Sequence, residues 1–157
     1  MSPVRVSAGL LPYTWTDDAL RVFLGHMGGP FYRNPTARGW SIIKGEFDPD
    51  DETPREAARR EWGEETGTEV PAGSWRDLGT VTQSGGKVVH AFGIDVDDPL
   101  EVTLVSCTTV RMMWPARSGR WITFPEIDEA GWRDNEQARA GLVAAQAAFL
   151  DRIADAR

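Results

Sequence analysis

The chain has 157 residues, enough for one hydrophobic core and too few for two comfortable domains, so one domain over residues 1–157 is expected. Hydrophobic residues make up 41% and charged residues 26%, a composition that excludes wholesale disorder. The net charge of −7 disfavours a nucleic-acid polymer as partner, because two polyanions repel each other. Small phosphorylated molecules stay compatible with this charge, because a bound cation bridges them locally.

Targeting signals are not evident in the sequence. The residues near the start lack a signal-peptide core, and no later apolar run is long enough to span a bilayer. The single cysteine, Cys107, cannot form an internal disulfide, which fits a reducing compartment. We therefore expect a cytoplasmic protein without a membrane partner.

Two strands begin the predicted fold. Val4–Tyr13 and Leu20–Met27 are rich in β-branched and large apolar residues, and Thr16–Asp18 between them is typical of a hairpin turn. The segment Gly28–Gly39 has the glycine and proline content of a loop. A short apolar segment, Trp40–Ile43, follows it.

A helix from Thr53 to Thr66 carries three agreeing start signals. Thr53 is a capping residue, Pro54 occupies the first helical position, and Glu56 completes a capping box. Gly67 supplies the expected stop. We expect Trp62 to pack this helix against the sheet.

Beyond the helix, the pattern predicts a second hairpin and a terminal helix. The strands are Asp77–Gln83 and Lys87–Val96, joined by a turn at Ser84–Gly86. Thr109–Phe124 shows no regular pattern, and Leu142–Ala156 has the apolar spacing of an amphipathic helix. Strands mixed with two helices favour a layered α/β or α+β domain over a helical bundle.

Three carboxylates share one face of the predicted helix. At about 100° per residue, Glu61 and Glu65 lie roughly 40° apart, and Glu64 lies roughly 60° to the other side of Glu61. Such like charges destabilise a helix unless a cation is nearby, and Mg²⁺ prefers carboxylate oxygens. The alternative is an ordinary solvated helix surface.

The residues around these glutamates resemble the Nudix hydrolase box. The matching string is Gly45, six residues, Glu52, seven residues, and then Arg60, Glu61, Trp62, Gly63, Glu64, Glu65, Thr66 and Gly67. The family has five residues in the first gap, so either one residue is inserted here or Asp51 takes the place of Glu52. Thr68 also replaces the usual apolar residue.

This resemblance implies an α/β fold, specifically an α/β/α sandwich with a mixed sheet between helices. It also implies metal-dependent hydrolysis of a diphosphate linkage, with Mg²⁺ or Mn²⁺ as cofactor. Glu61, Glu64, Glu65 and the backbone carbonyl of Lys44 would then hold the metal, with Glu126 as an additional acid from a loop.

Two further roles follow from the resemblance. Arg60 would hold Glu61 by a charge-assisted hydrogen bond, and either Glu61 or Glu64 would be the general base. Glu126 is equally compatible with a plain surface position.

Candidate substrate-binding residues lie near the box. Lys44, Arg38 and Lys87 are cations that suit phosphate, and Trp40 could stack on a base. For each of them, ordinary surface solvation or core packing is the alternative.

The resemblance implies a small nucleotide-type substrate: a nucleoside triphosphate, a dinucleoside polyphosphate or a nucleotide sugar. The segments flanking the box look like a bacterial branch described as predicted NTP pyrophosphohydrolases, and Trp40 with Lys44 is similar to the diadenosine polyphosphate hydrolases. A non-catalytic ligand-binding module of the same fold is the alternative function. A homodimer is compatible with both the hydrolase and the ligand-binding module.

Overall fold

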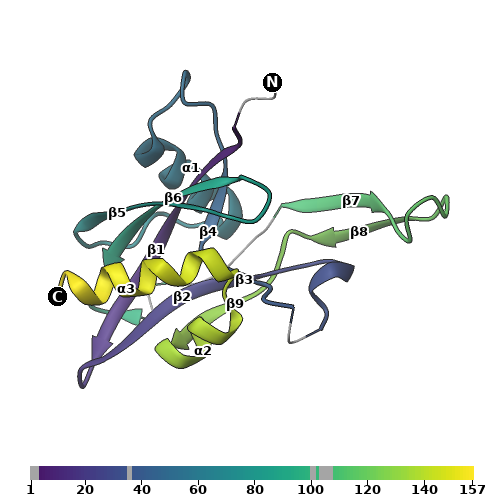
Figure 1. Cartoon of the computed structure of the whole chain (residues 1–157). Coiled ribbons are helices and arrows are strands. Elements are labelled where there is room, and N and C mark those ends of the chain that lie inside the picture. Colours follow the sequence, from purple (N-terminus) through teal and green to yellow (C-terminus); the bar gives the residue numbers. More distant parts are fainter. Residues whose placement is uncertain (1–3, 35–36, 100–101, 103–107) are drawn as a thin grey trace.

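The computed structural model describes residues 4–34, 37–99, 102 and 108–157, so Cys107 lies outside the described residues (Figure 1). The strands are β1 Val6–Thr16, β2 Ala19–Met27, β3 Trp40–Ser41, β4 Ile43–Glu46, β5 Trp75–Thr82, β6 Val88–Asp95, β7 Thr109–Met113, β8 Trp121–Pro125 and β9 Ile127–Asp134. The α-helices are α1 Pro54–Thr66, α2 Asn135–Gly141 and α3 Ala147–Asp155, and the short 3₁₀ helices are η1 Pro30–Tyr32 and η3 Ala144–Gln146.

Within the described residues, seven strands form one mixed sheet. Its main path runs β3-β2-β1-β6-β5, and in addition β4 pairs with β1 and β9 pairs with β2. β1 and β6 run parallel, and the other pairs are antiparallel. The separate β7–β8 hairpin projects from the body of the molecule (Figure 1).

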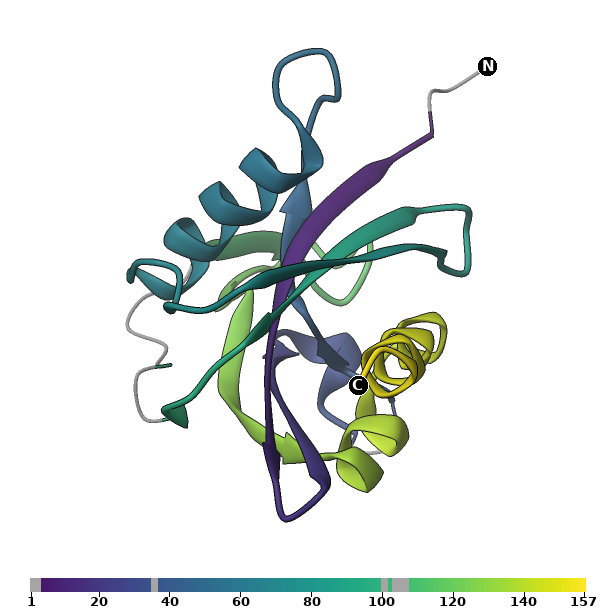
Figure 2. The ribbon, with the colours of Figure 1, turned by 90° about the vertical axis from the view of Figure 1, so that its left-hand side faces the viewer.

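The sheet lies between helices, which confirms the predicted sandwich. Figure 2 shows α1 and α3 on opposite sides of the sheet. Successive residues of a strand point to opposite faces, so Leu10 packs in the core beneath α1 whereas Leu11 packs in the core beneath α3. No helix among the described residues is long and apolar enough to cross a membrane.

Helix α1 begins and ends as predicted. The Thr53 hydroxyl accepts the N–H of Glu56 at 3.1 Å, the Glu56 carboxylate accepts the N–H of Thr53 at 3.3 Å, and Gly67 ends the helix at φ 71°. The Trp62 side chain is fully buried, and its ring lies 5.9 Å from that of Phe23 on the sheet. The expected packing role of Trp62 is therefore confirmed.

Three elements in the last third of the chain differ from the predictions. Residues 109–125 form a regular hairpin, and β9 pairs with β2 although no strand was predicted there. The terminal α-helix begins at Ala147 rather than at Leu142, because Leu142 is extended and bridges Trp40. Strand pairing, local in the hairpin and long-range in the other two segments, decides these structures, and periodicity alone does not encode it.

We predict that Trp62→Ala lowers the free energy of unfolding by about 3 to 5 kcal/mol, because it leaves a cavity between α1 and the sheet. Urea denaturation measures the change. Trp121→Ala is the matched control, because Trp121 is 53% exposed and its loss should cost less than about 1 kcal/mol. Equal losses in the two variants would contradict the packing role of Trp62.

Candidate active site

The three glutamates of α1 differ in exposure. Glu61 and Glu65 are 7% and 3% exposed, whereas the side chain of Glu64 is 52% exposed. All three line one open cavity of about 410 Å³. The residues that line it are Arg5, Ser7, Lys44, Gly45, Glu46, Glu61, Glu64, Glu65, Lys87, Thr108 and Glu126.

Arg60 joins three carboxylates beside this cavity. Its Nη1 donates to Glu61 at 2.9 Å and to Glu64 at 3.2 Å, while its Nε and Nη2 donate to Glu52 at 3.0 and 2.6 Å. Glu52 rather than Asp51 therefore pairs with Arg60, which favours a one-residue insertion in the preceding loop. The guanidinium offsets the repulsion among neighbouring acids on α1.

Gly45 on β4 allows Glu61 to approach the strand. A Cβ at Gly45 would lie 2.0 to 2.3 Å from the carboxylate atoms of Glu61, closer than any contact allows. The carboxylate of Glu61 consequently rests against the backbone next to Lys44, whose carbonyl was predicted as a metal ligand. Glycine at position 45 thus permits a close approach that a side chain would displace.

Glu65 is the most buried of the three glutamates of α1. Burial, followed by repulsion from Glu126, raises the pKa of Glu65 to about 7. Thr108 donates to one carboxylate oxygen of Glu65 at 3.3 Å, and the other oxygen, Oε2, is buried and has no hydrogen-bond partner within the part of the chain that the structure describes. Burial also raises the pKa of Glu61, although its hydrogen bond to Arg60 works in the opposite direction.

The chemistry of these donors fits a hard divalent cation. Five carboxylates line the cavity together with a strand backbone, and among the described residues the buried Oε2 of Glu65 has no hydrogen-bond donor, so it is available to a cation. Among the described residues, however, no group of three acidic, histidine or cysteine side chains is arranged to hold a metal ion. Arg60 holds Glu61 and Glu64 in the present arrangement.

Two of the predicted substrate-binding cations, Lys44 and Lys87, line the cavity. Burial lowers the pKa of Lys44, and the nearby charge of Lys87 lowers it further. Glu126 lies at the bend between β8 and β9 and also lines the cavity, so the structure brings it to the glutamates of α1.

Arg38 and Trp40 do not line this cavity. The Arg38 guanidinium donates to the carbonyls of Arg139 and Leu142 at 3.0 and 3.2 Å, so it binds the end of α2. The Trp40 ring packs against the core beneath α3, with the Arg133 guanidinium 4.0 Å from its centre. Both side chains thus have structural partners on the other face of the sheet.

Sequence reasoning missed four residues of the cavity: Arg5, Ser7, Glu46 and Thr108. Ser7 carried a signal, because it is a lone hydroxyl within the apolar start of β1. Thr108 carried none, since it reaches Glu65 from a segment 43 residues further along the chain.

The chain belongs to the NUDIX domain family, whose model matches residues 5–153. Membership implies hydrolysis of diphosphate linkages in nucleoside diphosphate derivatives, and enzymes of this family generally use divalent metal ions. No curated protein sequence matches this one.

Solved structures share the fold at low sequence identity. The NUDIX domain of Shewanella oneidensis NrtR, complexed with ADP ribose, has a TM-score of 0.60 at 17% identity, covering 99% of this chain and 90% of that one. The C. elegans Ap4A hydrolase gives 0.61 at 19% identity and 98% coverage of both chains. The C-terminal domain of mouse MUTYH, in complex with human PCNA, gives 0.62 at 16% identity, covering 99% and 90%.

We predict that Gly45→Ala lowers Mn²⁺ affinity by about 10- to 100-fold while the protein stays folded, because the added methyl displaces the flexible end of Glu61. Titration calorimetry measures the affinity. Gly63→Ala is the control, because a Cβ there meets no atom within 4 Å and should only strengthen the helix, by up to about 1 kcal/mol. Unchanged Mn²⁺ affinity in Gly45→Ala would show that the position of Glu61 is immaterial.

We also predict that the metal-free protein loses stability as pH rises from about 4.5 to about 7. The pKa of Glu65 is about 7 in the folded state and 4.5 as its ordinary value, so over this window the folded state binds more protons than the unfolded state. Urea denaturation in chelator at pH 5 and pH 7 measures the loss. Glu65→Gln should weaken it, and an unaltered pH dependence in that variant would exclude Glu65 as its source.

Proposed function

We propose that this protein hydrolyses a diphosphate linkage in a nucleoside-diphosphate-linked substrate, with Mg²⁺ or Mn²⁺ as cofactor. The observation that supports this most directly is the convergence of Glu61, Glu64, Glu65 and Glu126 on one open cavity in a chain of the NUDIX family. The substrate is a nucleoside triphosphate, a dinucleoside polyphosphate or a nucleotide sugar. The expectation of a cytoplasmic enzyme acting on small molecules belongs to the same proposal.

Glu61, Glu64, Glu65 and the carbonyl of Lys44 are the proposed metal ligands, with Glu126 as an additional acid. The metal, when bound, acts as a Lewis acid on the diphosphate and lowers the pKa of a bound water. The carboxylates of this chain are suited to that task because hard cations prefer oxygen ligands. Substrate phosphates complete the shell of such a cation in open sites.

Glu64 is the better candidate for the base of the two that the sequence left open. The Glu61 carboxylate is confined between Arg60 and Gly45, whereas Glu64 is half exposed and borders the open cavity. In the proposed step, a water oxygen attacks phosphorus, the bond from phosphorus to the bridging oxygen breaks, and Glu64 accepts the proton that the water loses. Arg60 positions both carboxylates.

Lys44 and Lys87 are the cations proposed to neutralise substrate phosphate. Both line the cavity together with the acids, and an ammonium group within a partly buried site attracts phosphate more strongly than one in open solvent. The names of two similar structures, one a complex with ADP ribose and one an Ap4A hydrolase, support a nucleotide-type substrate.

We predict that Glu64→Gln lowers kcat by about 10²- to 10⁴-fold, the range expected for loss of a general base, with little change in stability. Initial rates of phosphate or pyrophosphate release with saturating Mg²⁺ measure the effect.

Glu69→Gln is the matched control, because Glu69 is exposed beyond the end of α1 and does not line the cavity. It should retain the rate of the unmodified protein. A Glu64→Gln variant with the same kcat as Glu69→Gln would remove Glu64 from the mechanism.

A further inference from the structure

Basic side chains line the same cavity as the α1 glutamates. Arg5 and Lys87 line it together with Ser7, and Glu46 is the acid among them. A cation site needs none of these donors, so they indicate that the cavity also receives an anion.

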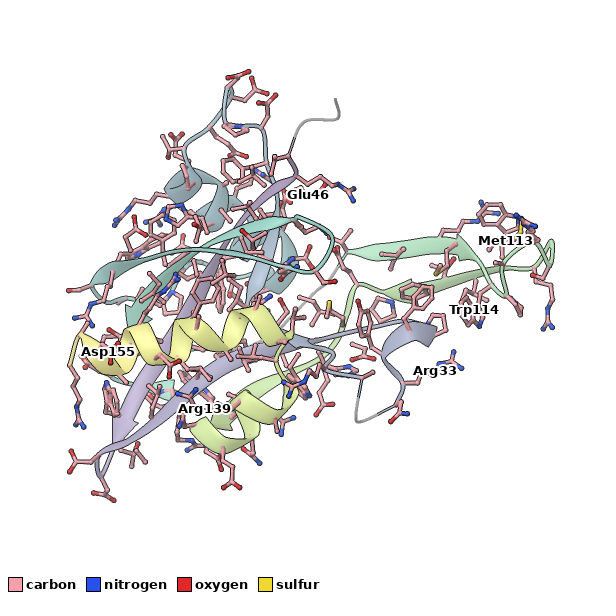
Figure 3. All side chains as sticks on the ribbon, viewed as in Figure 1. Arg33, Glu46, Met113, Trp114, Arg139 and Asp155 are labelled. Atoms are coloured by element: carbon pink, nitrogen blue, oxygen red, sulfur yellow. The ribbon has the colours of Figure 1, made fainter. Side chains whose placement is uncertain are left out.

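Three neighbouring strands bring these side chains together. Ser7 on β1 pairs with Glu46 on β4 in the antiparallel register, so the two side chains share one face of the sheet. The backbone carbonyl of Arg5 accepts the N–H of Val88, which places Lys87 beside the start of β1. Glu46 is labelled in Figure 3, where it lies on the body of the molecule, away from Met113 and Trp114 at the far end of the hairpin.

Ser7 is the buried polar residue of this group. The residue is 1% exposed and lines the cavity, yet its Oγ has no hydrogen-bond partner among the described residues. A buried hydroxyl without a partner is destabilising, whereas a phosphate oxygen could accept a hydrogen bond from it.

Glu46 forms ion pairs with both Arg5 and Lys87. Its Oε1 lies 3.0 Å from Nε of Arg5 and 3.9 Å from Nζ of Lys87. Glu46 is about half exposed, so its carboxylate is free to turn outward when a more highly charged group enters. Two cations against one carboxylate leave a net positive charge for that group.

We propose that Arg5, Ser7 and Lys87 form an anion subsite for a phosphate beyond the diphosphate that the glutamates hold. This inference rests on the proposed function for the reaction itself. It names the substrate class: a nucleoside triphosphate or longer polyphosphate presents a charged phosphate at this subsite, whereas ADP-ribose presents a neutral sugar.

The test compares kcat/KM for ATP and for ADP-ribose with Mg²⁺ in the unmodified protein, Ser7→Ala, Arg5→Gln and the control Arg21→Gln. Arg21 is exposed on β2 and does not line the cavity. The ratio of the two constants, ATP over ADP-ribose, should fall about tenfold in Ser7→Ala and in Arg5→Gln, as expected for one lost hydrogen bond to a charged group. The control should keep the ratio.

Ser7→Ala should unfold at the same or a higher urea concentration, because it removes an unsatisfied hydroxyl.

Ratios that stay the same in both variants would overturn the subsite while leaving the hydrolase proposal intact. If the unmodified protein turns over neither substrate, the hydrolase proposal is decided with the wider set of diphosphate substrates, and calorimetry with inorganic tripolyphosphate tests the subsite alone. Weaker tripolyphosphate binding by Ser7→Ala than by Arg21→Gln supports the subsite, and equal binding overturns it.

Discussion

The hydrogen bonds of the Arg60 guanidinium stabilise the cluster of carboxylates at the cavity. Arg60 binds Glu52, Glu61 and Glu64 at once, and these acids, Glu52 foremost, raise its pKa so that it stays charged. Without it, α1 would carry three carboxylates on one face and lose the cation that binds two of them directly. Glu61 in particular stays buried because it accepts a charge-assisted hydrogen bond from Arg60.

The fold supplies the second constraint by bringing α1 close to a short strand. Trp62 fixes one side of the helix in the core, and this leaves Glu61 and Glu65 facing the end of β4. Gly45 then permits backbone contact with the Glu61 carboxylate. The packing of Trp62 therefore also fixes the geometry of the site. A shift of α1 would move its carboxylates relative to Lys44 and Lys87.

The sequence predicted what local signals encode. The caps of α1, the early and middle hairpins and the box residues are short-range patterns, and the structure has them where they were expected. The strand β9 was missed because Ile127–Asp134 lacks apolar alternation and is held by pairing with β2, about 100 residues earlier. The positions of Arg38 and Trp40 away from the cavity depend on which sheet face each side chain occupies, and the sequence around them does not determine that face.

The central claim is that these carboxylates act with a divalent metal on a diphosphate linkage. The most direct test measures release of phosphate or pyrophosphate from nucleoside triphosphates, dinucleoside polyphosphates and ADP-ribose, with Mg²⁺, with Mn²⁺ and with chelator. Our account predicts turnover of at least one substrate that either metal supports and chelator abolishes. Absence of turnover from every substrate, by protein that demonstrably binds Mn²⁺, would contradict it and favour a ligand-binding module.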